Sequence, residues 1–229
     1  MDSRASIALG VLLLSAAFVA RADDVPSNSL RVGAYYVTYN VSADDIKGPF
    51  VPPGVNVDLK SVVTPYFAYV RRLSGRFSLE LAFGVPPLTK TVGKGPATLG
   101  SVPYNGQVIS TARWFAPTLL LNFYLLDETH RLRPYIGAGV NYTRFYDRQS
   151  TPAGDAASGG PTSIKLPSSV GPAGTVGLAY HVSGGFNVYA SYSVSRVHTL
   201  LTADTAGVIR NSHIEFGPRA LVVSAGYSF

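Results

Sequence analysis

The sequence contains no cysteine, and it also lacks long hydrophobic runs and clustered charge. Without cysteine there are no disulfides, so the chain is not one of the small secreted domains that disulfides hold together. Only 14% of the residues are charged, yet residues 23–229 contain no run of about 18 apolar residues, which excludes a membrane-spanning helix there. A membrane protein of this composition must therefore be a closed β-barrel.

Nucleic-acid, metal and cofactor sites have little support in the sequence. The formal net charge is +6, but the basic residues form no stripe and no recognition motif, so nucleic acid is not an expected partner. Loop cations that face anionic lipopolysaccharide or solvent explain the charge better. The four histidines include no pair with i, i+4 spacing, so we expect no metal site. Gly137-x-Gly139 lies inside a predicted strand and is not a phosphate loop, so we expect no cofactor.

Residues 1–22 have the pattern of an export signal. Arg4 precedes an apolar stretch over 5–20, and Ala20-Arg21-Ala22 provides a small-x-small cleavage site. The stretch is shorter than the ~20 residues that a spanning helix needs, and two aspartates follow it at once. We therefore predict cleavage before Asp23 and a single mature domain over residues 23–229.

Amphipathic strands dominate that domain. In each of them apolar side chains alternate with small or polar ones, which is the pattern of a strand with two different faces. The third is the clearest, because Phe77, Leu79, Leu81 and Phe83 alternate with smaller or polar residues. The eight predicted strands are 30–38, 62–70, 77–85, 115–125, 136–143, 175–180, 186–195 and 221–229.

The connections between these strands alternate in length. Those over 71–76, 126–132 and 181–185 are tight turns. The four others, about 39–61, 89–114, 146–174 and 196–219, are long and rich in glycine, proline, serine and aspartate. The alternation puts every long loop on one rim, which an up-and-down barrel of the outer membrane requires. A β-sandwich is the alternative, but it does not require such alternation.

The predicted fold is thus an all-β, eight-stranded antiparallel up-and-down transmembrane barrel. Eight strands leave a narrow interior, which side chains fill or one slim ligand occupies. Glu80 and Arg31 both face inward by parity and would pair inside it, although a shift of one residue would exchange the faces of a strand. The candidate lumen residues are Tyr35, Tyr66, Glu80, Ala82, Tyr124, Tyr189 and Ser193.

Apolar residues in the long loops are candidates for a vestibule above the lumen. A mouth lined with apolar side chains would shield an apolar solute from the charged lipopolysaccharide layer. Packing of the loops against each other explains the same residues equally well. The candidate vestibule residues are Phe50, Val51, Leu99, Leu200 and Leu201.

Several segments resemble the OmpW family of outer-membrane proteins. They are Leu79-Glu80-Leu81-Ala82, residues 116–124 (APTLLLNFY), residues 133–143 (RPYIGAGVNYT) and residues 224–229 (SAGYSF). The block over 133–143 is the most specific, whereas a terminal Tyr-x-Phe, here Tyr227 and Phe229, is common to many outer-membrane barrels. The resemblance covers nearly the whole of residues 23–229.

The resemblance implies a hydrophobic lumen that helps small apolar molecules across the outer membrane, with a side opening into the bilayer. It also implies that Tyr227 and Phe229 present the chain to the barrel-assembly machinery. In the family, bulky residues narrow the lumen at positions matching Ala82 and Ser193, which are small here. Tyr35, Tyr66, Tyr124 and Tyr189 are the alternatives for a constriction. Arg219 stands where relatives tend to have an aromatic residue.

Two other functions remain open from the residues alone. A lipid A-modifying enzyme would need a nucleophile and a base near the outer rim. Ser195, His198, His213 and Glu215 supply suitable groups, but their spacing matches no motif, so we predict that the chain is not an enzyme. A structural or adhesive barrel with a plugged core is the other alternative.

Overall fold

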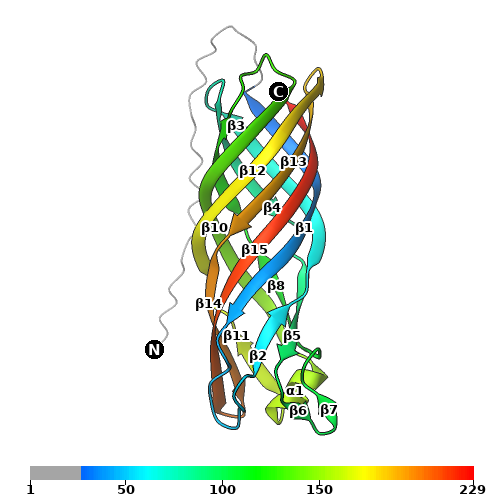
Figure 1. Ribbon diagram of the computed structural model, residues 1–229, viewed down its shortest axis with the longest axis vertical. Helices are drawn as coiled ribbons and strands as arrows, with labels where there is room; N and C mark the ends of the chain where they lie inside the picture. Colours follow the sequence, from blue (N-terminus) through cyan, green and yellow to red (C-terminus); the bar gives the residue numbers. More distant parts are fainter. Residues whose placement is uncertain (1–26) are drawn as a thin grey trace, which may run out of the picture.

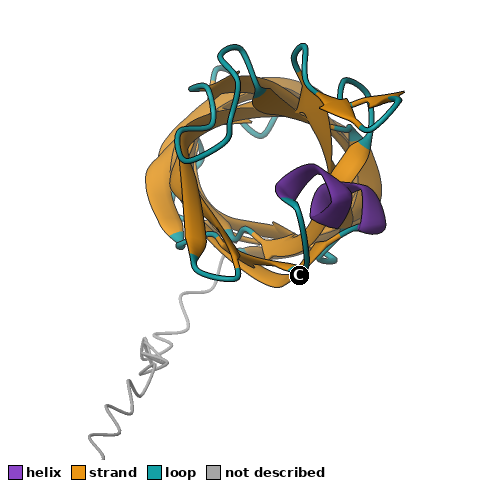
Figure 2. Ribbon diagram, turned by 90° about the horizontal axis from the view of Figure 1, so that it is seen from below, coloured by secondary structure: helices purple, strands orange, loops and turns teal. Residues whose placement is uncertain are grey.

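The computed structural model describes residues 27–229, and the predicted export signal lies outside them. Most of this part forms one closed ring of antiparallel strands (Figures 1 and 2). The eight strands of the ring, in the order in which they pair, are β1 (Asn28–Ala43), β3 (Val62–Arg72), β4 (Phe77–Gly84), β9 (Thr118–Tyr124), β10 (Leu132–Ser150), β12 (Ser169–Ser183), β13 (Phe186–Ser195) and β15 (Val208–Ser228).

The first and last strands close the ring. β1 and β15 pair from Ser29 and Ser228 at one end to Ala43 and Ile214 at the other. Phe229 and Asn28 exchange two further backbone hydrogen bonds beyond the ladder. Because closure pairs every strand on both sides, the ring has no free edge within the membrane. The predicted eight-stranded antiparallel barrel is confirmed.

Alternation along the strands sorts the side chains into two environments. On β15, Val222 and Ser224 are buried, whereas Leu221, Val223 and Tyr227 are exposed. β4 follows the same pattern, with its apolar residues outside and Ser78, Glu80 and Ala82 inside. The outer surface is therefore an apolar belt around a partly polar interior, which is the arrangement of a membrane barrel. Tyr227 and Phe229 both lie on this outer surface.

The two ends of the barrel differ. The short turns and the C-terminus lie together at the top of Figure 1, and we call this the turn end. The longer connections lie at the other end, the loop end, where α1 sits at the rim of the ring (Figure 2). Within residues 27–229, no helix is long and apolar enough to cross a membrane.

The connections at the loop end contain more regular structure than the sequence suggests. β1, β10 and β15 run on into the segments that we expected to be loops, and further strands pair with them there. The additional elements are β2 (Asn56–Leu59), β5 (Leu88–Lys94), β6 (Thr98–Leu99), β7 (Val102–Pro103), β8 (Val108–Phe115), α1 (Pro152–Ser158), β11 (Thr162–Lys165) and β14 (Val197–Thr205).

The fourth predicted strand, 115–125, needs a correction. The strand is interrupted at Ala116-Pro117, so its first residue, Phe115, ends β8 and the rest begins β9 at Thr118. Pro117 has no N–H to donate to a ladder, which explains the interruption. The break lies in the wall of the barrel.

Asp127, in the turn between β9 and β10, gives a prediction for the turn end. The hydroxyl of Thr129, His130 and the backbone N–H of Thr129 all bond its carboxylate and lower its pKa from 3.8 to about 2. These bonds stabilise the turn fully when the pH is above 3.8, the ordinary pKa of aspartate. The stabilisation is lost as the pH falls through about 2 and the carboxylate is protonated. An NMR titration should find this pKa, and Thr129→Ala should raise it. A value near 4 in the folded protein would contradict the hydrogen bonding.

Candidate functional site

The structure places all seven predicted lumen residues on the inner face of the barrel. Six are buried, and Ser193 is partly buried and donates a hydrogen bond to Thr175 (2.9 Å). They do not form one group. Tyr35, Tyr66, Glu80, Ala82 and Ser193 line an apolar cavity, whereas Tyr124 and Tyr189 lie nearer the turn end.

A buried ion pair crosses the lumen between these two groups. Nη1 of Arg31 lies 2.9 Å from Oε2 of Glu80, and both side chains face inward as the parity of β1 and β4 predicted. Asn122 also donates to Oε2 and Tyr66 donates to Oε1, both at 2.7 Å. We call Arg31, Tyr66, Glu80 and Asn122, together with Tyr124 and Tyr189, the polar plug. Each carboxylate oxygen is thus hydrogen-bonded, as a buried charge requires.

Aromatic rings complete the plug on the side of Arg31. The guanidinium carbon lies 3.6 Å from the centre of the Tyr189 ring, and Nη2 donates to the Tyr124 hydroxyl at 3.2 Å. A ring face stabilises a cation in this position. Arg31 Nε and Ser78 Oγ are buried without a hydrogen-bond partner in the described part of the chain, and water commonly completes such sites.

The polar plug separates two cavities. The cavity on the turn-end side includes Arg31, Tyr124 and Tyr189 among its lining residues, and its volume is about 900 Å³, including solvent at its mouth. The cavity on the loop-end side encloses about 1330 Å³, including solvent at its mouth. No residue in the described range lines both. The plug therefore closes the straight path through the barrel.

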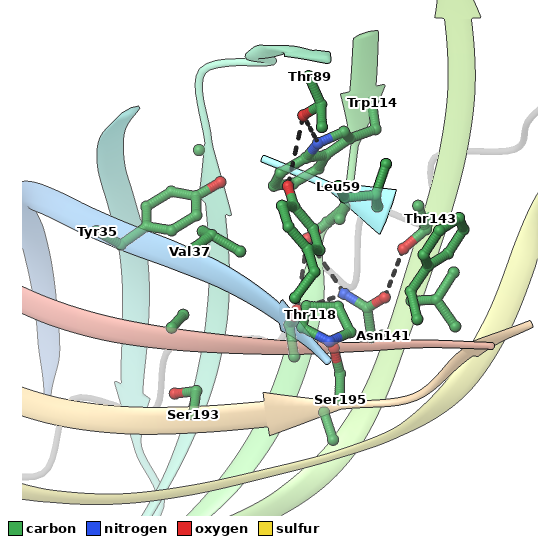
Figure 3. A pocket seen from close by; sticks show the side chains of 18 of the residues that line it. Tyr35, Val37, Leu59, Thr89, Trp114, Thr118, Asn141, Thr143, Ser193 and Ser195 are labelled. Atoms are coloured by element: carbon green, nitrogen blue, oxygen red, sulfur yellow. Dashed lines mark hydrogen bonds between the residues drawn. The ribbon is translucent and has the colours of Figure 1, made fainter. Parts of the chain in front are cut away.

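We call the loop-end space the apolar cavity. A buried cluster of Tyr35, Val37, Tyr66, Ala82 and Val222 forms its wall beside the plug. Tyr35 and Tyr66 meet edge to face with ring centres 6.1 Å apart. The neighbouring strands β9 and β10 add a hydrogen-bonded polar group to the lining, in which Asn141 donates to Thr118 (2.8 Å) and accepts from Thr143 (2.7 Å) (Figure 3). Since these polar atoms bond one another, the cavity suits an apolar occupant.

Trp114 and Thr89 also line the apolar cavity, although the sequence analysis assigned both to a long loop. The indole N–H of Trp114 donates to the hydroxyl oxygen of Thr89 at 2.9 Å (Figure 3). One signal in the sequence could have found them. Ala112 and Trp114 alternate with Arg113 and Phe115 just as residues of the recognised strands do.

A third cavity, of about 850 Å³ including solvent at its mouth, lies at the loop end and shares residues such as Val57 and Leu201 with the apolar cavity. Phe50, Val51 and Leu99 line it as well, although Phe50 remains 90% exposed. Leu200 does not line either cavity. Alternation along β14 turns Leu200 to the outside when Leu201 faces in, so the expectation for Leu200 needs correction.

The wall of the barrel is interrupted between β4 and β9. Their ladder ends at the pair Ala82 and Thr118. The next ladder, between β5 and β8, begins only at the pair Leu88 and Arg113. Within the described chain, no ladder pair joins residues 83–87 to 114–117. Pro86, Pro87 and Pro117 all lie here and cannot donate to a ladder. We call this the wall interruption.

The apolar cavity reaches the wall interruption. Phe83, Gly84 and Ala116, which flank the missing pairs, are among its lining residues. Phe83 is also exposed on the outer surface, where its ring lies 6.3 Å from that of Phe115. The lining of the cavity therefore includes residues at the wall interruption, one of which is also exposed on the apolar belt.

The residues considered for catalysis are not brought together. Ser195 lines the apolar cavity, whereas His198 and His213 are exposed on the outer face. His198 lies 3.9 Å from the Glu215 carboxylate, but a base outside the barrel cannot activate a hydroxyl inside it. Within residues 27–229, no group of three metal-binding side chains is present.

Comparison with known sequences identifies the family. The model of the OmpW family matches residues 29–229. Outer membrane protein W of Vibrio cholerae is 25% identical over 87% of each chain. Outer membrane protein W of Escherichia coli is 30% identical over 142 residues, which are 59% of this chain and 66% of that protein.

Comparison with solved structures shows the same fold. OprG of Pseudomonas aeruginosa superposes with a TM-score of 0.79 at 21% identity, over 89% of this chain and 96% of that chain. AlkL superposes with a TM-score of 0.65 at 21% identity, over 93% and 95% of the two chains.

These findings locate the protein in the outer membrane. The family consists of channel-like or structural barrels rather than enzymes, in agreement with the separated Ser195 and His198. With a family match over nearly all of the described residues and a closed eight-stranded ring, the chain belongs to the OmpW family of outer-membrane proteins.

Proposed function

We propose that this protein carries small hydrophobic molecules from the cell exterior into the outer membrane. The solute would enter at the loop end, cross the apolar cavity and leave sideways through the wall interruption. One observation carries the proposal: the lining of the cavity includes Ala116 at the wall interruption and Phe83, which is also exposed on the outer surface, while the Arg31–Glu80 pair lies across the straight path.

The physical need for such a path comes from lipopolysaccharide. Its charged headgroup layer is a poor solvent for apolar molecules, although the acyl chains beneath would accept them. A lining of apolar side chains lets the solute avoid that layer. Phe50, Val51, Leu99 and Leu201 would form the entrance and Tyr35, Tyr66 and Ala82 the passage.

The names of two relatives agree with the transport of apolar molecules. DoxH, a dibenzothiophene metabolism operon protein of Pseudomonas sp. (strain C18), is 30% identical over 51% of this chain and 52% of that protein. The outer membrane protein AlkL of Ectopseudomonas oleovorans is 25% identical over 77% of this chain and 70% of that protein. An operon for an aromatic sulfur compound suggests an apolar solute.

Uptake into liposomes tests the proposal. We expect purified protein to accelerate the entry of octane and naphthalene into liposomes that contain lipopolysaccharide, compared with the same liposomes that hold an unrelated eight-stranded barrel. A rate equal to that of the unrelated barrel for both solutes would contradict the proposed function.

A substitution at the wall interruption tests the exit route. Ala116→Phe adds a ring where the cavity meets the lipid-facing surface, so the initial rate of uptake should fall severalfold. The matched control is Ala34→Phe, which adds the same ring on the exposed outer face of β1 and should leave uptake unchanged. Equal rates for the two variants would exclude exit at this place.

The polar plug also supports a second candidate, a structural or adhesive barrel without transport. A lumen closed by a hydrogen-bonded ion pair strengthens the barrel whether or not a solute passes. This candidate predicts no uptake above the unrelated barrel and no effect of Ala116→Phe.

A further inference from the structure

Trp114, the single tryptophan of the chain, belongs to a group of hydrogen-bonded side chains inside the lumen. Trp114 on β8 donates from Nε1 to Oγ1 of Thr89 on β5, at 2.9 Å. The same oxygen shares a hydrogen bond of 3.4 Å with the hydroxyl of Tyr39 on β1. Three strands are therefore joined through one buried threonine, and two large rings lie beside it (Figure 3).

All three residues line the apolar cavity. Tyr39 and Trp114 pack against the cluster of Tyr35, Val37 and Tyr66 on the plug side. Val57 and Leu201 line the same cavity on the side of the loop end. On the proposed route, a solute that moves from the loop end toward the plug travels along a wall that carries these two rings.

The group also borders the wall interruption. Thr89 follows Pro87 by two residues on one side, and Trp114 precedes Pro117 by three on the other. The hydrogen bond from Trp114 to Thr89 therefore joins the first paired strands beyond the interruption, β5 and β8, across the inner face of the wall. Movement of the indole would widen the passage beside the exit.

The hydrogen bonds hold the indole in place. Its N–H donates to a buried hydroxyl oxygen, so displacing the indole costs a buried hydrogen bond. Thr89 is buried and supplies the acceptor. Ala82 and Ser193, which match the positions of bulky residues in the family, are small here, whereas Tyr39 and Trp114 place two large rings in the lining of the same cavity.

We propose that Tyr39, Thr89 and Trp114 form a latch that limits the width of the solutes that pass. A slim unbranched hydrocarbon passes beside the closed latch, whereas a solute several fused rings wide requires the indole to move. This inference rests on the proposed transport of apolar molecules. In it, Tyr39, Thr89 and Trp114 select among apolar solutes by their width.

Thr89→Val tests the latch, because valine keeps the size of threonine and removes the acceptor. Loss of one neutral hydrogen bond shifts an opening equilibrium about five-fold, so uptake of phenanthrene relative to octane should rise by about that factor. Thr111→Val is the matched control, since Thr111 on β8 lines none of the cavities described. Its ratio should equal that of the unchanged protein.

The results separate the latch from the proposed function. If the unchanged protein transports neither solute, the proposed function fails and the latch fails with it. If it transports octane but Thr89→Val leaves the ratio of the two rates unchanged, the latch alone is wrong. Trp114→Phe keeps a ring without a donor and should raise the ratio as well, so the test stands if Thr89→Val does not fold.

Fluorescence provides a readout that needs no transport. Because Trp114 is the single tryptophan, all indole emission of the folded protein in liposomes comes from the latch. Thr89→Val should change the emission maximum, since the indole loses its hydrogen-bond acceptor, and Thr111→Val should not. Identical spectra for the two variants would overturn the latch. Brominated naphthalene should quench the emission of the unchanged protein saturably, and a failure to quench would also contradict a solute path past Trp114.

Discussion

Replacing Glu80 with alanine is expected to lower the free energy of unfolding by about 3–5 kcal/mol, the usual cost of breaking a buried ion pair by removing one partner. Arg31 would keep its charge inside the lumen with no carboxylate beside it. Tyr66 and Asn122 would also lose their acceptor. Urea unfolding of the barrel in liposomes, followed by heat-dependent migration on gels, measures the effect.

Ser78→Ala is the matched control for Glu80→Ala. Ser78 precedes Glu80 by two residues on the inner face of β4 and is equally buried, at 3% exposed against 4%. Its hydroxyl has no hydrogen-bond partner in the described chain, so its removal should cost little. If both variants unfold at the same urea concentration, the plug contributes no stability.

A double replacement distinguishes the charge from the packing. Arg31→Met combined with Glu80→Leu removes both charges and keeps apolar bulk, so it should recover much of the stability lost in Glu80→Ala. A double variant as unstable as the single one would indicate that the unpaired charge is not the cause of the defect, and would point to the lost hydrogen bonds of Tyr66 and Asn122.

Val223→Arg is expected to destabilise the barrel by about 2–4 kcal/mol, the cost of arginine on the lipid face at the middle of the bilayer. Val223 is 57% exposed, and on β15 it lies midway between Arg219 and Tyr227. Its neighbours across the ladders are Ala34 and Ala190, which offer no counter-charge. The same urea unfolding measures the change.

Asn40→Arg is the control for the depth of the membrane. Asn40 is exposed on β1 and pairs with Gly217, beyond Arg219 toward the loop end. Arginine near the membrane surface costs only about 0–1 kcal/mol. Equal losses at positions 40 and 223 would contradict the placement of the apolar belt.

The strand pattern was predictable because a membrane barrel has two unlike environments. Lipid outside and a narrow lumen inside force alternation with a period of two, and the eight predicted strands show it. The inward placement of Glu80 and Arg31 followed from that parity alone. Their contact did not, since it depends on the stagger of β1, β3 and β4 around the ring.

The site was harder to predict at the loop end. Thr89 and Trp114 lie in a segment whose glycines and prolines resemble those of a loop, although β5 and β8 pair within it. Leu200 and Leu201 were equally apolar candidates, and only the direction of β14 separates them. Pairing partners far away in the chain decide such cases.

The sequence by itself determined the class of this protein. Periodicity, connection lengths and the absence of apolar helices leave only a closed barrel, because lipid requires every backbone polar group to be paired within the protein. The tertiary structure alone decided where the lumen closes and where it opens. The polar plug consists of residues from strands that are distant in sequence, and the wall interruption lies between such strands. Ring closure sets the stagger of these strands.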